Sequence, residues 1–517
     1  MSSVTGPSPP PDAPSGPPPR PDLGANAAAA LVVLSSAAVL VVEITALRLL
    51  APYLGLTLET STLVIGIALA AIALGSWAGG RMADRTDPRK LIGSALGGSG
   101  AVVALTPSML RMAAEWAPPL LLIVASLTIL IPGALLSAVT PMVTKLRLTT
   151  LDQTGTVVGQ LSGLATVGAI AGTVLTGFVL ISRLPVSAIL IGLGALLVAG
   201  GAVVEWRMRR WNRVNAAGLA LIIAVGGLAS YVAPGGCDVE TKYHCVRVVT
   251  DPDRGSGATL VLDGLNHSYV DLDDPTRLQF TYVRAFAAAV DAAFPAGQPV
   301  KAYHLGGGGL TFPRYLAATR PGTRSVVAEI DEGVVRTDRG RLGLASATDI
   351  DVRVEDGRLG LRRLEAGSRD LIVGDAFGGV SVPWHLATTE ALADVRRVLN
   401  DDGVYVANLI DYGEMAFVRA EIATVLENFD YVMLAGEPRD LGIGPVAAPD
   451  GGNVVVVAAN RPLDTRALQK ALSGWSTGWT ILDGDALRGW IGTAETLTDD
   501  YAPVDQLLTP ARARGAR

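Results

Sequence analysis

The stretch His304-Leu-Gly-Gly-Gly-Gly-Leu310 follows an apolar run that we expect to form a strand, Val300–Leu305. Consecutive glycines let the backbone approach a ligand closely, because no Cβ atom stands in the way. About twenty residues later, Val327-Ala-Glu-Ile-Asp331 ends the next expected strand with two acids, Glu329 and Asp331, a spacing typical of a carboxylate that binds ribose hydroxyls. A tight turn followed by a solvated acid would produce the same pattern. We favour the nucleotide-type site, because strand, loop, helix and acid occur together.

Two further acids follow expected strands. Asp356-Gly357 comes after Asp351–Val354, and Asp375 follows the apolar run Leu371–Gly374. Ligands of open α/β sheets bind at the carboxyl ends of the strands. Taken singly, each acid is better explained as a helix N-cap. Together they predict a site for an adenosine and a cationic substrate.

From about Asp238 onward, short strand-like runs alternate with helical segments. Cys245–Thr250 and Thr259–Leu262 suggest a small N-terminal β-element. Further strands are expected at Ser325–Ile330, Asp370–Gly374, Gly403–Leu409 and Asn453–Ala459, and helices at Leu278–Phe294 and Leu386–Leu399. Such alternation predicts a parallel, doubly wound sheet, that is, an α/β Rossmann-like domain.

The first half of the chain has a different composition. Of 517 residues 50% are apolar and only 17% are charged, below the roughly 25% charged residues of soluble domains. A membrane-spanning helix needs about 20 apolar residues. Seven stretches qualify, at 26–47, 60–80, 91–110, 117–139, 155–181, 184–204 and 215–233. None shows the polar face of a soluble bundle, which favours a multi-pass α-helical membrane bundle over buried core helices.

These patterns divide the chain into a disordered Pro-rich tail (1–24), a transmembrane domain (25–234), the small β-element (238–277) and the Rossmann-like domain (278–510). The tail lacks the charged start of a signal peptide. No basic run in the second half suggests nucleic acid. Two cysteines, Cys237 and Cys245, are too few for a zinc site, and we expect no metal. A disulfide and two free thiols are both compatible with the sequence.

Small residues within the bundle have a regular spacing. Gly159, Gly163, Gly168 and Gly172 recur every four or five residues, which lets helix backbones approach closely in lipid. We therefore predict a helix-packing face here rather than a transport path. Glu43 and Arg48 lie near the end of the first span, where we favour a structural ion pair or an interfacial anchor over a functional site.

The distribution of Lys and Arg among the short loops predicts the orientation. Eleven lie on the side of the N-terminus, namely Arg20, Arg81, Arg85, Arg89, Lys90, Lys145, Arg147, Arg207, Arg209, Arg210 and Arg213. Three lie on the other side, Arg48, Arg111 and Arg183. This places the N-terminus in the cytoplasm and, after seven spans, the soluble domain outside, where the cysteines would be free to form a disulfide.

The residues of the second half resemble those of the spermidine synthases, aminopropyltransferases that use decarboxylated S-adenosylmethionine. The matches, in order, are Leu260-Val-Leu-Asp-Gly264, Tyr282, Gly306–Gly309, Glu329-Ile-Asp331, Asp356-Gly357 and Asp375-Ala-Phe377. The whole chain resembles membrane-fused, spermidine synthase-like proteins, including the span-end signature Arg48-Leu-Leu-Ala-Pro-Tyr-Leu-Gly55.

The resemblance implies a role for each matched position. Glu329 would hold the ribose, Asp356 would lie by the adenine, and Asp375 would be the catalytic residue that accepts the amine proton. The co-substrate site would comprise His267, Gly306, Gly307, Gly308, Gly309, Glu329, Asp331, Asp356 and Gly357. Tyr282 and Asp375 would contact the substrate, a small amine such as putrescine. The other expected partner is the lipid bilayer, and a homodimer stays open.

Four positions depart from the family pattern. An Asp of the loop is replaced by Gly309, the partner of Tyr282 by Val283, a Gln by His267 and a second Asp by Gly378. A dicationic amine in a partly dry site needs carboxylates, so the co-substrate half is better supported than the amine half. Two alternatives remain, namely a methyltransferase that uses S-adenosylmethionine and a non-catalytic transporter or sensor for a polyamine or nucleoside. The cytoplasmic origin of adenosyl cofactors opposes the orientation that the charges predict.

Overall fold

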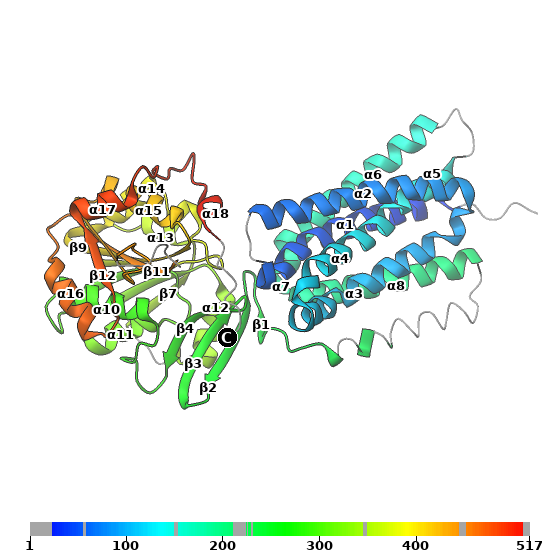
Figure 1. Ribbon diagram of the computed structural model, residues 1–517. Coiled ribbons are helices and arrows are strands. Elements are labelled where there is room, and N and C mark those ends of the chain that lie inside the picture. Colours follow the sequence, from blue (N-terminus) through cyan, green and yellow to red (C-terminus); the bar gives the residue numbers. More distant parts are fainter. Residues whose placement is uncertain are drawn as a thin grey trace, which may run out of the picture.

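The structure, a computed structural model, describes residues 23–54, 58–148, 154–209, 224, 226–228, 231–344, 349–443 and 451–509. It consists of a bundle of long helices and an α/β domain that meet end to end (Figure 1).

The bundle contains six described helical segments that are long and apolar enough to cross a membrane. Its main helices are α1 (Ala25–Leu54), α2 (Leu58–Arg85), α3 (Ile92–Trp116), α4 (Leu121–Ser137), α5 (Val139–Arg147), α6 (Thr154–Leu175) and α8 (Val186–Arg209). A π-helical turn, η4 (Thr176–Leu180), and α7 (Ile181–Arg183) extend α6. These segments correspond to the first six predicted spans. Most of the seventh predicted span, 215–233, lies outside the described residues.

The glycine spacing of α6 has two different outcomes. A Cβ atom on Gly168 would lie 2.4 Å from the carbonyl oxygen of Val33, and one on Gly172 would lie 2.6 Å from that of Ala37. These two glycines therefore form the predicted packing face, against α1. For Gly159 and Gly163 the prediction is wrong within the described part of the chain, because a Cβ atom there would meet no described atom within 4 Å. The spacing alone could not show which of the four glycines face α1.

The soluble domain is built on an eight-stranded sheet with the order β12-β10-β11-β9-β8-β5-β6-β7. The strands are β5 (Lys301–Leu305), β6 (Arg324–Glu329), β7 (Ile350–Val354), β8 (Arg369–Gly374), β9 (Leu399–Tyr412), β10 (Tyr431–Gly436), β11 (Gly451–Ala459) and β12 (Thr480–Asp483). Strands β7, β6, β5, β8 and β9 pair in parallel, as predicted from the alternating pattern.

The prediction of an entirely parallel sheet is wrong at one edge. β11 is antiparallel to both of its neighbours, β9 and β10, and β12 is antiparallel to β10. α15 (Ala416–Asn428) connects β9 to β10 and lets these two strands run in the same direction. β11 follows β10 without an intervening described helix and pairs with it directly, which reverses its direction.

Helices cover both faces of this sheet (Figure 1). Alternate residues of β8 point to opposite faces, as the strand period of two requires. Leu371 and Val373 pack with α10 (Thr281–Ala293), α11 (Thr311–Thr319) and α16 (Thr465–Gly474). Ile372 packs on the other face with α14 (Thr389–Val398), α15 and α17 (Gly484–Ile491). The other described α-helices of this domain are α12 (Glu332–Arg341), α13 (Gly357–Arg362) and α18 (Val504–Leu507).

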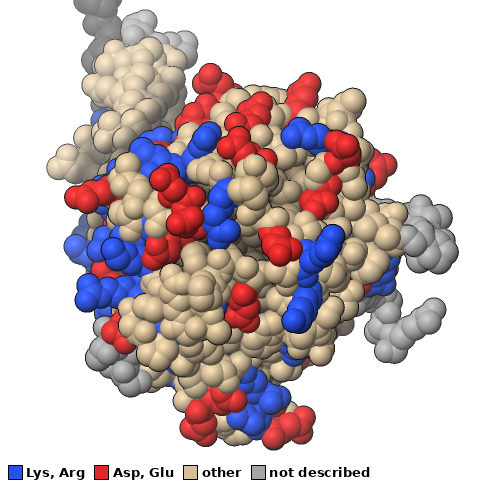
Figure 2. Space-filling view, turned by 90° about the vertical axis from the view of Figure 1, so that its left-hand side faces the viewer, with Lys and Arg blue, Asp and Glu red and all other residues tan. Residues whose placement is uncertain are grey.

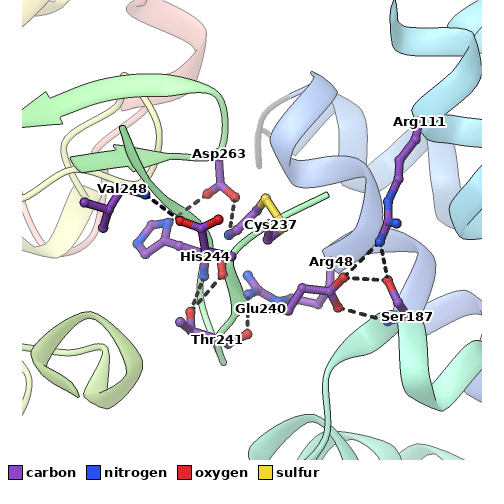
Figure 3. The surroundings of a disulfide bond; sticks show 11 residues. Arg48, Arg111, Ser187, Cys237, Glu240, Thr241, His244, Val248 and Asp263 are labelled. Atoms are coloured by element: carbon purple, nitrogen blue, oxygen red, sulfur yellow. Dashed lines mark hydrogen bonds and ion pairs between the residues drawn. A yellow bond between two sulfur atoms is a disulfide. The ribbon is translucent and has the colours of Figure 1, made fainter. Parts of the chain in front are cut away.

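A smaller antiparallel sheet precedes this domain, as predicted. It contains β1 (Val239–Glu240), β2 (Cys245–Asp251), β3 (Arg254–Leu262) and β4 (Leu265–Asp271) in that order. Its buried face packs on Val334 and Leu342 near α12. A disulfide joins Cys237 to Cys245, which decides between the bonded pair and the free thiols. It closes the β1–β2 hairpin at the junction with the bundle (Figure 3).

The hairpin contacts one end of the bundle. The carboxylate of Glu240 accepts the N–H of Ser187 at 2.9 Å and lies 3.6 Å from Nη2 of Arg111. Arg48 donates from Nη2 to the carbonyl oxygen of Thr241 at 3.5 Å (Figure 3). Arg48 therefore anchors the soluble domain. These contacts lie at the C-terminal ends of α1 and α3 and at the N-terminal end of α8, opposite the start of α1.

The face of the soluble domain turned away from the bundle carries Lys and Arg interspersed with Asp and Glu (Figure 2). Mixed charges of this kind are typical of a solvated surface.

We predict that Gly168→Leu destabilises the bundle, whereas Gly163→Leu does not. The new side chain at position 168 would collide with the backbone of α1, and overpacking of this kind costs about 1–3 kcal/mol. The measurement is the thermal unfolding midpoint of the detergent-solubilised full chain. Equal midpoints for the two variants would show that α6 does not pack on α1 through Gly168.

Candidate functional site

A cavity of about 710 Å³ lies at the carboxyl ends of the central strands. Most of the predicted site residues line it. They are His267, Tyr282, Gly306, Gly307, Gly308, Glu329, Asp356, Gly357 and Asp375. Six separate chain segments thus contribute to one concave surface, the usual form of a small-molecule site.

The glycine loop after β5 forms the floor of this cavity. The N–H of Gly306 donates to the carbonyl oxygen of Ala328 at 3.0 Å. Gly306 has a φ of +97°, and a Cβ atom there would lie 2.3 Å from the carbonyl oxygen of Asp375. Only glycine combines this conformation with such a close approach. The loop is therefore held against the ends of β6 and β8.

Glu329, at the end of β6, holds the loop with its carboxylate. Oε2 accepts the N–H of Gly307 at 2.9 Å, and Oε1 accepts the N–H of Asp331 at 2.8 Å. Burial raises the pKa of Glu329, while these two backbone hydrogen bonds act in the opposite direction. An ionised carboxylate has about four acceptor sites. Two backbone donors therefore leave capacity for hydroxyl groups of a ligand.

Two predicted residues, Asp331 and Gly309, are not among the described residues that line the cavity. The Asp331 carboxylate caps α12 by accepting the N–H of Gly333 at 2.9 Å and also accepts the hydroxyl of Thr241. A Cβ atom on Gly309 would lie 2.0 Å from Oγ of Ser268. The loop aspartate of the spermidine synthases therefore has no room here, and its replacement by glycine follows from packing against β4.

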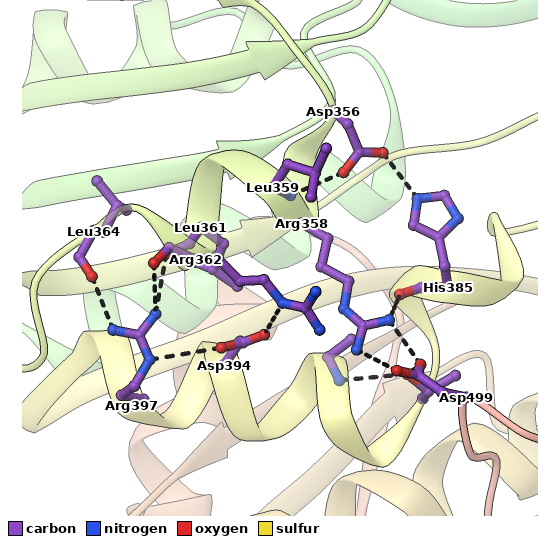
Figure 4. A network of polar contacts seen from close by, with 12 residues as sticks. Asp356, Arg358, Leu359, Leu361, Arg362, Leu364, His385, Asp394, Arg397 and Asp499 are labelled. Carbon is purple, nitrogen blue, oxygen red and sulfur yellow. Dashed lines mark hydrogen bonds and ion pairs between the residues drawn. The ribbon is translucent and has the colours of Figure 1, made fainter.

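Asp356 lies at another part of the rim. Its Oδ1 caps α13 by accepting the N–H of Leu359 at 2.9 Å, and its Oδ2 lies 3.0 Å from Nε2 of His385 (Figure 4). Asp356, Gly357 and His385 all line the cavity. The sequence allowed two explanations for Asp356, a helix N-cap and a residue of the site. Both are correct, because Asp356 caps α13 and also lines the cavity.

Arg358, two residues further on, supports this wall. It makes a bidentate pair with Asp499, at 2.7 and 2.8 Å, and also donates to the carbonyl oxygen of His385 at 3.0 Å (Figure 4). The hydrogen bond from Arg358 is the largest of the effects that lower the pKa of Asp499 to about 2. This pair ties the C-terminal segment to α13 and fixes His385 beside Asp356.

Asp375, which directly follows β8, also lines the cavity. Its Oδ1 accepts Nδ2 of Asn408 at 3.0 Å, and its Oδ2 accepts the hydroxyl of Tyr282 at 3.2 Å. Burial raises the pKa of Asp375 to about 6, although both hydrogen bonds act to lower it. The segment after Asp375 is not helical until Trp384. The helix-cap explanation for Asp375 is therefore wrong, and its carboxylate points to other side chains.

His267 and His304, which both line the cavity, are neutral at physiological pH. Burial lowers the pKa of His267 to about 4 and that of His304 to about 3. The carbonyl oxygen of His267 accepts the hydroxyl of Tyr282 at 3.3 Å. His267 therefore contributes a backbone acceptor and an uncharged ring.

Several polar residues of the cavity belong to no motif in the sequence. Nδ2 of Asn453 donates to Oδ1 of Asn408 at 2.9 Å, which orients the Asn408 amide toward Asp375. Asn408 lies within the otherwise apolar run Val404–Ile410 of β9, and a polar residue in a buried strand was the available signal. Glu437 and Asp440, which follow β10, also line the cavity. No sequence pattern placed them near Asp375.

Within the described residues, no three His, Cys, Asp or Glu side chains are grouped in a way that could hold a metal ion.

Comparison with known proteins shows similarity to polyamine aminopropyltransferases. Polyamine aminopropyltransferase 2 of Streptomyces coelicolor is 28% identical and covers 98% of this chain and 93% of its own length. The enzyme of Chromobacterium violaceum is 30% identical over 141 residues, and that of Vibrio vulnificus is 32% identical over 142 residues. Each matches 27% of this chain, which spans about half the length of these two curated relatives.

Among solved structures, a probable spermidine synthase from Corynebacterium glutamicum is 26% identical, with a TM-score of 0.47 over 51% of this chain and 96% of that one. No family model matches the chain.

We predict that Glu329→Ala weakens the binding of an adenosyl ligand by about 10- to 100-fold, because charge-assisted hydrogen bonds are lost. Isothermal titration calorimetry with the full chain measures this change. Glu332→Ala is the matched control, because Glu332 is exposed and pairs only with Arg336 among the described residues. If Glu329→Ala binds as tightly as the control while remaining folded, Glu329 does not belong to the site.

Proposed function

We propose that this chain is an aminopropyltransferase that moves the aminopropyl group of decarboxylated S-adenosylmethionine to a small amine such as putrescine. The observation that carries the proposal is the buried Asp375 carboxylate. It lies between Tyr282 and Asn408 and beside the glycine loop that Glu329 holds. The similarity to polyamine aminopropyltransferases over 98% of the chain supports the same activity.

The reaction requires a neutral amine. Its nitrogen attacks the aminopropyl carbon bound to the sulfonium, the carbon–sulfur bond breaks, and the sulfur leaves as the neutral thioether methylthioadenosine. The proton of the attacking amine passes to Asp375, which acts as general base. A carboxyl group with a pKa of about 6 is ionised at neutral pH and still retains enough basicity to hold that proton. The sulfonium is already a good leaving group, so positioning supplies much of the rate.

The co-substrate half of the site uses the residues around the glycine loop. Gly306, Gly307 and Gly308 would lie against the ligand, and the free acceptor sites of Glu329 would bind the ribose hydroxyls. Asp356, supported by His385, would lie at the adenine. Asp331 and Gly309 act behind this surface, one as the cap of α12 and the other by its fit against Ser268.

The amine half differs from the pattern of the spermidine synthases. Gly309 and Gly378 replace two acids, yet a diamine needs compensation for its second charge. We propose that Glu437 or Asp440 supplies that carboxylate, because both residues line the same cavity as Asp375. Tyr282 would orient the attacking end through its hydroxyl.

We also propose that the bundle is embedded in a membrane, with the N-terminus cytoplasmic and the soluble domain on the opposite side. The six apolar helices support the embedding. The soluble domain contacts the bundle end near Ser187, whereas α8 ends at Arg209 at the other end. The excess of Lys and Arg on the N-terminal side supports the orientation, and the Cys237–Cys245 disulfide suits an oxidising compartment.

If the soluble domain catalyses aminopropyl transfer and lies outside the cytoplasm, its co-substrate must reach it there. Decarboxylated S-adenosylmethionine is made in the cytoplasm, so it would have to cross the membrane to reach a domain on the outer side. An inverted orientation would remove this requirement and would place the disulfide in a reducing compartment.

For catalysis, we predict that Asp375→Asn keeps adenosyl ligand binding but lowers turnover by about 100-fold or more, the usual scale for losing a general base. In the unaltered chain, the rate should fall about tenfold per pH unit below pH 6, because the raised pKa leaves Asp375 protonated there. The measurement is single-turnover aminopropyl transfer to putrescine with saturating co-substrate.

Asp370→Asn is the control, because Asp370 contacts only Lys301 and Asn400 among the described residues. A near-normal rate for Asp375→Asn would refute the catalytic assignment. Methyl transfer from S-adenosylmethionine in place of aminopropyl transfer would favour the methyltransferase, and ligand binding without either reaction would favour a sensor or transporter.

For orientation, we predict that a reporter active only in the cytoplasm is silent when fused after Arg517 and active when fused after Arg213. The charge distribution and the position of the soluble domain both lead to this expectation. Activity of the Arg517 fusion together with silence of the Arg213 fusion would invert the orientation, and equal activity of both would contradict a crossing between them.

A further inference from the structure

A second cavity, of about 310 Å³, lies where the soluble domain meets the bundle. One wall is the end of α1, with Arg48, Leu49, Pro52 and Tyr53. The others come from the end of α3, the start of α8, and the disulfide-closed hairpin with β2. We call this space the junction cavity. His244 is its only described residue that also lines the proposed active site.

Three arginines from three different elements line the junction cavity, Arg48 on α1, Arg111 on α3 and Arg247 on β2. The Nε atom of Arg48 is buried and has no hydrogen-bond partner among the described residues. Arg247 is exposed, and the described part of the chain offers it no ion pair. Buried donors without partners are uncommon in proteins, because the loss of hydration is not compensated.

Among the side chains that line the junction cavity, arginines outnumber acids, while Asp263 and Asp331 act on Arg48 from outside the lining. Glu240 lies close to Arg111, at 3.6 Å, and also accepts two hydrogen bonds from Ser187. Glu115 is exposed. The lining side chains thus comprise three guanidinium groups and two carboxylates, one of which is already occupied. An anion with several acceptor oxygens is the complementary ligand.

We propose that the junction cavity binds a phosphate group and that, in the membrane, this is the headgroup phosphate of an anionic phospholipid. A guanidinium presents its donors as a planar fork that matches phosphate oxygens. The exposed guanidinium of Arg247 is available for such contacts, and Arg48 lines the cavity with a buried Nε that has no partner among the described residues. Arg111 is held near them by its hydrogen bond to Ser187 at 3.2 Å.

The position of the junction cavity favours a lipid over free phosphate. It lies at the ends of α1 and α3 and at the start of α8, the level at which headgroups meet the hydrocarbon core if the bundle is embedded as proposed. Apolar side chains of Leu49, Pro52 and Val186 form part of its wall beside the arginines. Arginines at this level can bind headgroup phosphates while their aliphatic stems lie against apolar groups.

This inference also gives a role to the span-end signature. Of Arg48-Leu-Leu-Ala-Pro-Tyr53, the residues Arg48, Leu49, Pro52 and Tyr53 all line the junction cavity. The transfer reaction uses none of them. The inference therefore depends on the proposed membrane location but not on the proposed catalysis, so either can fail alone.

The test is titration of the detergent-solubilised full chain with phosphatidylglycerol, with bound copies counted by native mass spectrometry. We expect Arg247→Gln to weaken binding by about tenfold, as for a lost charge-assisted contact. Arg48→Lys keeps the charge but removes the Nε donor, and should also weaken binding. Arg466→Gln is the matched control, because Arg466 is an exposed residue of α16, away from the bundle (Figure 1).

Two further ligands identify the chemistry and its source. A galactolipid with the same acyl chains lacks phosphate and should not distinguish Arg247→Gln from the unaltered chain. If inorganic phosphate binds as tightly as the lipid and loses the same affinity in Arg247→Gln, the phosphate site stands but its ligand is soluble. If Arg247→Gln and Arg48→Lys both bind phosphatidylglycerol as the control does, with adenosyl ligand affinity intact, the proposal is refuted.

Discussion

Four neighbouring parallel strands, β6, β5, β8 and β9, end at one edge of the sheet, and the proposed chemistry depends on this shared edge. Their pairing aligns Leu305 with Gly374 and Gly374 with Ala407. Consequently, the glycine loop, Asp375 and Asn408 lie next to each other, although about a hundred residues separate the first from the last along the chain. A shift of one residue in the register of any two of these strands would turn the side chains of the shifted strand to the opposite face of the sheet. The hydrophobic cores on both faces prevent such a shift.

Glu329 and Asp375 are both buried at these strand ends, but their hydrogen-bond donors differ. Glu329 and Asp375 both lose hydration, which raises the pKa of each carboxyl group. Glu329 accepts two backbone N–H groups, whereas Asp375 accepts only side-chain donors, from Asn408 and Tyr282. Backbone donors fix Glu329 as part of the loop. Side-chain donors orient Asp375 at the cavity, and burial raises its pKa to about 6, which suits proton transfer.

The hairpin closed by Cys237–Cys245 connects the two halves of the molecule through a few polar contacts. The carbonyl oxygen of Thr241 accepts a hydrogen bond from Arg48 of α1 (Figure 3). The hydroxyl of Thr241 donates to Asp331. The N–H of Asp331 in turn donates to Glu329. A continuous chain of hydrogen bonds therefore runs from the first helix of the bundle to the carboxylate that holds the glycine loop.

Local patterns in the sequence determined the apolar helices, the strand–loop–helix around Gly306 and the acids after β6, β7 and β8, because hydrophobic periodicity and glycine content act over a few neighbouring residues. They did not determine the reversed direction of β11 or the role of Asn408. Nor did they show that Gly159 and Gly163 lie outside the contact between α6 and α1. The loss of the loop acid at Gly309 could be read from the sequence, but its cause, the Ser268 side chain, could not. Nor could the sequence decide whether Cys237 and Cys245 are bonded or where Arg48 is used. Each of these depends on which distant segment packs alongside, and only the tertiary structure decides that.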